Sequence, residues 1–274
     1  MRLGMLLPAG PGGVPLGPAG IAEGARRLER TGFDSAWVFD SIGRGFILPD
    51  PLIALSVAAT VTSRIQLGTC VLQVPLRRPV ELAHRVLTAH LVADGRLVLG
   101  VGVGSTEDDF AAVGVDYDRR FRAFADALPV MRSLWRGETV GRARLTPWPA
   151  ALGGPPVLIG SWAGSRWIER AATTYDGWIG SAAKTSLRDL THGIQRFRAL
   201  GGSRAVVANV EVDLTAPAAG PAVEDAPFTL RCPPDEAAER LNRLAELGFD
   251  DAVLFGLDHR EETLATIRGL IPAG

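Results

Sequence analysis

Polar side chains follow several short apolar runs of this sequence, at the points where those runs end. Asp40 and Ser41 close the run SAWVFD, Ser105 follows GVGVG, and Ser181 and Lys184 close or follow GWIGS. A carboxylate can accept hydrogen bonds or move a proton, a hydroxyl can donate and accept, and a lysine can hold an anion. If the apolar runs are parallel strands, their carboxyl ends bring these groups to one edge of a sheet.

This set of side chains contains few strong acids or bases. The sequence has no glutamate pair at glycosidase spacing and no His-x-His or His-Glu-x-x-His motif, so we expect no metal. Three of the four histidines, His84, His90 and His192, fall in segments with helical spacing, where a helix-face role is the more common one. Glycines, hydroxyls and apolar side chains instead suit a large planar cofactor that supplies its own chemistry.

Lys184 is the only lysine in the chain. Chance retention on a surface loop would explain it. A mobile point charge that grips a phosphate or a carboxylate would explain it equally well. The sequence leaves both interpretations open.

The composition is that of a soluble globular protein, with 47% hydrophobic and 22% charged residues and a net charge of −1. Nucleic acids and anionic membranes need clustered positive charge, so we expect neither as a partner. Cys70 and Cys232 have no C-x-x-C neighbour, which argues against a zinc knuckle or a disulfide framework. We read no signal peptide and no apolar run of the roughly 18–20 residues that a membrane span needs, and therefore expect a cytoplasmic protein.

Eight apolar runs alternate with segments in which apolar residues recur every three or four positions. Apolar strands without polar alternation are typical of a parallel sheet covered on both faces. Eight strand–helix pairs predict a single (β/α)8 barrel, whereas a doubly wound sheet usually stops near six strands. The predicted strands are RLGMLLP (2–8), SAWVFD (35–40), IQLGTCVL (65–72), RLVLGVGVG (96–104), PVLIGSW (156–162), GWIGS (177–181), AVVANVEVDL (205–214) and AVLFGL (252–257).

We expect one domain over residues 1–274. The segment GVGVGS (100–105) lacks the third glycine and the helix start of a dinucleotide-binding fingerprint. Two stretches rich in proline and glycine or alanine interrupt the alternation. Residues 137–156, the long insertion after the fourth strand, are a candidate lid, and residues 215–227 are expected to be partly disordered.

Several segments, in order and with fitting spacing over about 180 residues, resemble the bacterial-luciferase-like family of flavin monooxygenases and deazaflavin (coenzyme F420) oxidoreductases. The resemblance fades beyond residue 200. Its segments are ERTGFDSAWVFD (29–40), TSRIQLGTCVLQVPLRRPVELAH (62–84), GRLVLGVGVG (95–104), FAAVGVDYDRR (110–120) with LWRG (134–137), and PPVLIGSWAGSRWIERAATTYDGWIGS (155–181).

The resemblance implies a non-proline cis peptide at Cys70–Val71, behind the flavin ring. Without the resemblance, Cys70 reads as a small core residue. Asp40 matches an acidic position that faces the ring, where burial would favour its neutral form unless a donor compensates. A histidine often follows it in deazaflavin members, and its replacement by Ser41 departs from the sugar-phosphate dehydrogenases. The alternative makes Asp40 the N-cap of the turn through Ser41 and Ile42.

Further positions carry implied roles. Val103 and Gly104 would contact the cofactor, and Ser105 would act in catalysis in place of an acid often found there, with Glu107 and Asp108 close behind. The segment Ala163, Gly164, Ser165 and Arg166 would bind the cofactor phosphate at a helix start, although a plain N-cap by Ser165 would look the same. Ser181 and Lys184 would hold substrate, with Ser181 also near the cofactor.

The resemblance predicts an oxidoreductase that uses reduced coenzyme F420 or FMN to transfer hydride or oxygen to a small organic molecule. We assign Asp40, Cys70 and Ser105 to catalysis and expect a homodimer. A flavin-binding barrel without turnover is the alternative, because acid–base groups are scarce. An unrelated phosphate-binding barrel enzyme is a third reading, although such barrels usually carry the phosphate site after strands seven and eight.

Overall fold

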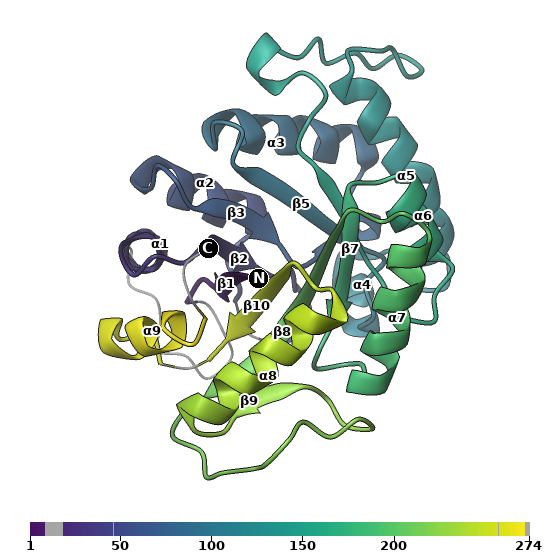
Figure 1. Cartoon of the computed structure of the whole chain (residues 1–274). Coiled ribbons are helices and arrows are strands. Elements are labelled where there is room, and N and C mark those ends of the chain that lie inside the picture. Colours follow the sequence, from purple (N-terminus) through teal and green to yellow (C-terminus); the bar gives the residue numbers. More distant parts are fainter. Residues whose placement is uncertain (9–18, 46, 257, 272–274) are drawn as a thin grey trace.

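The computed structural model describes residues 1–8, 19–45, 47–256 and 258–271. Within them, eight parallel strand positions close into a barrel surrounded by helices, which confirms the predicted fold (Figure 1). The barrel strands are β1 (Arg2–Leu6), β2 (Ser35–Val38), β3 (Gln66–Thr69) continued by β4 (Leu72–Gln73), β5 (Leu97–Gly102), β6 (Val157–Gly160), β7 (Gly177–Ser181), β8 (Arg204–Asp213) and β10 (Asp251–Phe255).

Helices follow the strands in the order that the sequence predicts, and α4 is an additional short one. They are α1 (Gly20–Arg30), α2 (Pro51–Val61), α3 (Pro79–Val92), α4 (Glu107–Val113), α5 (Arg120–Trp135), α6 (Trp167–Thr173), α7 (Leu187–Ala199), α8 (Pro234–Leu247) and α9 (Glu261–Arg268), with 3-10 turns η1 (Val74–Leu76) and η2 (Pro149–Ala151).

The barrel closes because β10 pairs with strands from both ends of the chain. It lies parallel to β1, from Arg2↔Asp251 to Met5↔Leu254, and parallel to β8 on its other side. The short strand β9 (Thr229–Arg231) adds to β8 outside this ring. Residue 257, which ends the predicted eighth strand, lies outside the described residues.

Apolar residues pack on both faces of the sheet. Residues from all around the ring fill the barrel interior, and a larger cluster lies between the sheet and the helices. Trp37 is the largest interior side chain, and the absence of side chains at Gly4 and Gly68 makes room for it, since a Cβ there would lie 2.6 and 2.3 Å from its ring. This two-sided burial is why the strands read as apolar runs without alternation.

Charged residues close the amino end of the barrel. Asp251, fully buried at the start of β10, accepts hydrogen bonds from Arg2 on β1 and Arg204 on β8, and the Arg204 guanidinium also donates to Gln66 Oε1 on β3 at 2.7 Å. Arg204 therefore reaches across the base of the barrel, from β8 to β3.

The prediction that residues 137–156 form a lid over the site is wrong. Residues 137–156 follow α5 and precede β6, which places them by the amino ends of the strands, beside α3 at the top of the view (Figure 1). Gly153 N donates to Trp135 O at 2.9 Å, and Trp135 Nε1 donates to Ala83 O. The segment therefore packs against α3 and α5 at the end of the barrel away from the predicted site residues.

The second loop, 215–227, is tied to neighbouring helices. Leu187 N and Arg188 N at the start of α7 donate to Ala226 O and Glu224 O at 3.0 and 2.8 Å. Arg188 also pairs with Asp225 at 2.7 Å. These contacts give the loop a defined path along α7, in place of the partial disorder that we expected.

Candidate functional site

A cavity of about 930 Å³ opens at the carboxyl ends of the barrel strands. Most residues predicted for the site line it, namely Asp40, Cys70, Val71, Val103, Gly104, Ser105, Ser165, Ser181 and Lys184. Ala163, Gly164 and Arg166 belong to the same turn as Ser165 but are not among the lining residues. The structure thus brings together side chains that come from all parts of the sequence.

The third strand breaks at the floor of this cavity. The Cys70–Val71 bond is a non-proline cis peptide, as predicted, and separates β3 from β4. Val71 projects between Gly102 and Gly160, where an added Cβ would lie 2.6 Å from Val71 Cγ2 or Cγ1. The two glycines therefore leave the space that Val71 fills at the ends of β5 and β6. Burial raises the pKa of the Cys70 thiol to about 12, so this thiol stays protonated at neutral pH.

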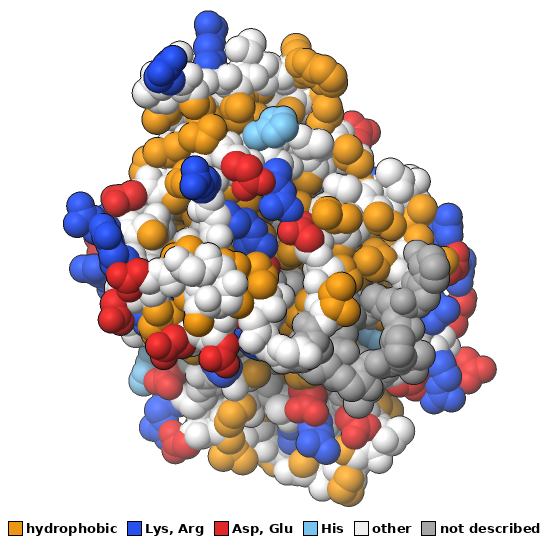
Figure 2. Space-filling view, turned by 180° about the vertical axis from the view of Figure 1, so that it is seen from behind, with side chains coloured by type: hydrophobic (Ala, Val, Ile, Leu, Met, Phe, Trp, Pro, Cys, Tyr) orange, Lys and Arg blue, Asp and Glu red, His pale blue; other side chains and the backbone are white. Residues whose placement is uncertain are grey.

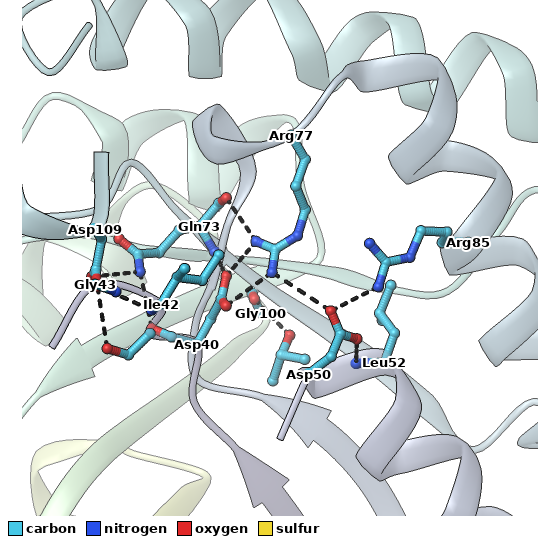
Figure 3. A network of polar contacts seen from close by, with 12 residues as sticks. Asp40, Ile42, Gly43, Asp50, Leu52, Gln73, Arg77, Arg85, Gly100 and Asp109 are labelled. Carbon is cyan, nitrogen blue, oxygen red and sulfur yellow. Dashed lines mark hydrogen bonds and ion pairs between the residues drawn. The ribbon is translucent and has the colours of Figure 1, made fainter. Parts of the chain in front are cut away.

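Asp40 lines the cavity, but its carboxylate is already bound. Arg77 Nη2 donates to Oδ1 at 2.9 Å, Arg77 Nη1 donates to Oδ2, and Gln73 N donates to Oδ2 at 2.9 Å (Figure 3). These donors satisfy both oxygens of a carboxylate that is almost completely buried. The Arg77 guanidinium also lies 3.8 Å from Asp50, which pairs with Arg85 and caps α2 through Leu52 N and Ile53 N.

The turn after Asp40 is capped by a different carboxylate. Asp109 Oδ1 accepts hydrogen bonds from Ile42 N at 3.1 Å, Gly43 N at 3.0 Å and Ser41 Oγ at 3.2 Å. The interpretation of Asp40 as the N-cap of this turn is therefore wrong. Asp109 on α4 accepts the hydrogen bonds from the backbone of the turn instead.

Asp109 collects further donors through its second oxygen. Gln73 Nε2 and Arg44 Nη2 both donate to Oδ2 at 3.0 Å. Burial raises the pKa of this carboxyl, but the hydrogen bonds from Gln73, Arg44, Gly43 and Ile42 outweigh it and lower the pKa to about 2. One ionised group thereby joins α4, β4 and the loop after β2 (Figure 3).

Close packing explains the glycine after Val103. Gly104 has a φ of +80°, and an added Cβ would lie 2.4 Å from Gln73 Oε1 and 2.8 Å from the Phe110 ring. Ser105, the next residue, accepts a hydrogen bond on its backbone oxygen from Tyr117 at 3.1 Å. A side chain at residue 104 would therefore collide with the amide of Gln73.

The turn before α6 has the form of a serine cap. Ser165 Oγ accepts a hydrogen bond from Trp167 N at 3.1 Å, and Ser165 N donates to Trp162 O. A Cβ at Gly164 would meet no atom within 4 Å, so space is open on that side of the turn. Both the cap and an anion site at this turn are compatible with the geometry.

Two residues that we did not assign also line the cavity. Asn209, on β8, donates from Nδ2 to Ser181 Oγ at 3.1 Å. His259, which follows β10, has a buried Nδ1 without a hydrogen-bond partner among the described residues. Burial, together with the charge of Arg27, lowers the pKa of His259, so its imidazole is neutral at pH 7. Its position just beyond a barrel strand was the available sequence signal, whereas nothing in the sequence singled out Asn209.

Three further observations bear on the class of site. In the described part of the chain, no group of three or more histidine, cysteine, aspartate or glutamate side chains lies close enough to hold a metal ion. No helix there is both long and apolar enough to cross a membrane. Acidic and basic side chains lie next to one another over the face shown in Figure 2, without gathering by sign.

Fold and site together define a (β/α)8 barrel with a deep cavity at the strand carboxyl ends and a cis peptide in its floor. The sequence pattern of luciferase-like monooxygenases matches residues 1–218, and the chain belongs to that family.

Relatives of this chain include an uncharacterized protein and a named dehydrogenase. An uncharacterized protein of Mycobacterium tuberculosis is 31% identical over 223 residues, which is 77% of this chain and 70% of that protein. An F420-dependent glucose-6-phosphate dehydrogenase of Amycolatopsis mediterranei is 33% identical over 132 residues, or 45% of this chain and 40% of that enzyme.

Solved structures confirm the architecture. A monooxygenase of Streptomyces bottropensis superposes with a TM-score of 0.78 at 19% identity, covering 98% of this chain and 97% of its own. The coenzyme F420-dependent tetrahydromethanopterin reductase of Methanopyrus kandleri gives 0.77 at 16%, with 98% of both chains covered. The oxygenating constituent of 3,6-diketocamphane monooxygenase of Pseudomonas putida, in complex with FMN, gives 0.73 at 14%, with 98% and 95% covered. At these identities the likeness shows the fold.

Proposed function

We propose that this chain, one domain over residues 1–274, is an oxidoreductase that uses reduced coenzyme F420 or FMN to transfer hydride or oxygen to a small organic substrate. The observation that carries the proposal is the cavity floor, where Val71 follows a cis peptide and stands between Gly102 and Gly160. A planar ring needs a firm apolar support on one face, and this arrangement supplies one. Relatives that use F420 and a neighbour that binds FMN support both cofactors.

The bound cofactor would supply the hydride or activate oxygen, and the protein would supply position. In this proposal Cys70, Val71, Val103 and Gly104 support the ring. Asp40, held by Arg77, presents a fixed charge at the wall, and Ser105 and Ser181 offer hydroxyls at the rim. The turn of Ala163, Gly164, Ser165 and Arg166 would hold a cofactor phosphate through its backbone amides and one guanidinium.

Lys184 has a place in this proposal at the mouth of the cavity. It lines the cavity, its side chain is exposed, and it forms no ion pair with a described residue. An ammonium that forms no ion pair in the described part of the chain is available for an anionic group of the substrate. Replacing Lys184 with Met should therefore weaken the binding of an anionic substrate more than the binding of a neutral one.

A binding protein without turnover is the second candidate, and the state of the acids favours it. The carboxylates of Asp40 and Asp109 are already engaged by the hydrogen bonds described above. His259 is the side chain of the cavity wall that retains a neutral, titratable nitrogen. If the protein turns substrate over, His259 is the group that we expect to move a proton.

Titration of the protein with oxidised FMN and with oxidised F420, followed by cofactor fluorescence, tests the proposal. We expect saturable binding of one of the two at one site per chain. Val71→Asp should abolish it, and Arg142→Ala, at the opposite end of the barrel, should leave it unchanged. Binding of neither cofactor would contradict the proposal. Stopped-flow mixing of the reduced complex with oxygen and with ketone acceptors then separates an enzyme from a binding protein.

A cytoplasmic homodimer acting on a small molecule, without nucleic acid or membrane partners, completes the proposal. The net charge of −1 and the mixed charge of the face shown in Figure 2 support the absence of nucleic acid. Light scattering on the purified protein tests the dimer, and a single-chain mass at micromolar concentration would contradict it.

A further inference from the structure

Asn209 has a backbone conformation that is rare for a residue inside a strand. Its φ is +58°, although it lies in the middle of β8. The pairing of β8 with β10 is irregular at the same place, because Val207 faces Ala252 while Val210 faces Leu254. Three steps along β8 thus match two along β10, which is a β-bulge with one extra residue. Bulges re-aim side chains, and they are common near functional sites.

The bulge changes which side chains of β8 face the barrel interior. Before it, Val206 and Ala208 belong to the interior cluster, and Ala205 and Val207 pack outward against the helices. Strict alternation would turn residue 210 inward, yet Val210 and Val212 pack outward with the helices. The extra residue, Asn209, is therefore placed on the cavity side directly after Ala208.

Asn209 meets Ser181 of the adjacent strand β7 there. Asn209 Nδ2 donates to Ser181 Oγ at 3.1 Å, and both residues line the cavity. Since Ser181 Oγ accepts this bond, its own hydrogen is free to donate elsewhere. Asn209 Oδ1 and the buried Oγ of Ser161, at the end of β6, have no hydrogen-bond partner among the described residues. Three neighbouring strands, β6, β7 and β8, therefore offer both donors and acceptors to a ligand.

We propose that Asn209 and Ser181 form a polar subsite that binds an uncharged hydroxyl group of the substrate. This inference rests on the proposed function, since it assumes that a substrate enters this cavity. A hydroxyl both donates and accepts, and so matches Asn209 Oδ1 and the Ser181 hydrogen together. A phosphate dianion or carboxylate only accepts, and would leave Oδ1 facing a negative charge. Asn209 is thereby a specificity-determining residue, distinct from the charge of Lys184.

Asn209 could also be present only because the backbone of the bulge needs it, and substitutions separate this role from ligand binding. Asparagine adopts positive φ more readily than most residues, so the bulge alone could account for it. Glycine adopts the same conformation freely, whereas alanine is strained there. Asn209→Gly should therefore keep the melting temperature of the protein and remove only the amide. Asn209→Ala should lower the melting temperature, and Asn209→Asp keeps the backbone preference but removes the Nδ2 donor.

Ligand-observed NMR with two small probes tests the subsite without turnover. The probes are trans-1,2-cyclohexanediol, which is neutral, and cyclohexanecarboxylate, titrated into wild type, Asn209→Gly, Ser181→Ala and, as a distant control, Arg142→Ala. Loss of a neutral hydrogen bond weakens binding by roughly three- to tenfold. We expect that loss for the diol in Asn209→Gly and Ser181→Ala and no change in Arg142→Ala. The carboxylate should depend on Lys184, which Lys184→Met tests.

Two outcomes would overturn the subsite. Equal diol affinity in wild type and Asn209→Gly would show that the asparagine serves only the backbone, and so would a wild type that does not bind the diol saturably. If Asn209→Gly does not fold, Ser181→Ala carries the test with the same expectation. Titration of Asn209→Gly with FMN and F420 separates this result from the cofactor proposal, because the affinity of this variant for the cofactor should stay within twofold of wild type.

Discussion

Arg77 and Asp40 face each other as a fork, with Nη2 2.9 Å from Oδ1 and Nη1 next to Oδ2. Both side chains are buried, at 8% and 2% exposure. Gln73 N donates to the same carboxylate, so the pair joins the end of β2 to β4, directly after the cis peptide. A buried ion pair of this kind is strongly destabilising to break from one side, because the remaining charge has no partner.

Asp40→Ala should therefore lower the free energy of unfolding by about 3 kcal/mol. It should also weaken cofactor binding at least about tenfold, or roughly 1.4 kcal/mol, because β4 loses its anchor. Urea denaturation and fluorescence titration of the same variant measure the two effects. As a control, Asp40→Ala combined with Arg77→Met should cost less than the sum of the single changes. A stable Asp40→Ala protein with full affinity would remove Asp40 from the site.

Asp109 should make the stability of the protein depend on pH in the acid range. Its pKa in the folded state is lowered to about 2, below that of an unfolded chain, so its contribution is present above about pH 4 and is lost as pH falls toward 2. Asp109→Asn should cost about 2 kcal/mol at pH 7. The difference from wild type should shrink between pH 4 and pH 3 in chemical denaturation. A constant difference across this range would argue against an ionised Asp109.

The effect of a larger residue at position 160 should depend on the size of the side chain at position 71. Gly160→Ala places a Cβ 2.6 Å from Val71 Cγ1, an overpacking that costs about 1–3 kcal/mol and should displace the cavity floor. We expect weaker cofactor binding and a lower melting temperature. Adding Val71→Ala to Gly160→Ala should restore most of the stability. If the double variant is no more stable than Gly160→Ala, the close approach of these two residues is not the cause.

Mild acidification should lower the stability of the folded protein, because it protonates His259. Its pKa is lowered in the folded state, so folding favours the neutral imidazole, and stability that is present above about pH 6.5 is lost as pH falls through the folded-state pKa. Thermal melts between pH 7.5 and pH 5 should show a smaller decrease for His259→Gln than for wild type. His90→Gln is the matched comparison, because the pKa of the buried His90 on α3 is lowered by burial as well. Identical pH profiles for wild type and His259→Gln would contradict the assignment.

The barrel could be predicted because its strands depend on local sequence. Strands buried on both faces must be apolar throughout, so the runs from residue 2 to residue 255 stood out. The cis bond at Cys70–Val71 came from a resemblance, since no propensity would suggest it. The error over residues 137–156 was avoidable, because a loop that follows a helix and precedes a strand must lie at the amino end of the barrel.

Two features of the site depend on three-dimensional register and were not predictable. Glu107, Asp108 and Asp109 are three acids in one helical turn, and only the rotation of α4 decides that Asp109 meets Gly43 N and Gln73. Likewise, no residue type marks the bulge at Asn209, since its effect appears only when β8 is aligned with β10. Sequence indicates which groups a strand end carries, but a single rotated or inserted residue decides which of them face the cavity.

The charged base of the barrel limits the route by which ligands can enter and leave the cavity. Asp251, Arg2, Arg204 and Gln66 block the amino end, and packed side chains fill the middle. In the part of the chain that the structure describes, this packing closes the amino end, and the cavity opens at the carboxyl ends of the strands. If the cofactor lies on the floor at Val71 and the substrate above it, as proposed, the cofactor should bind before the substrate. Steady-state kinetics with the two should then follow a compulsory order rather than a random one.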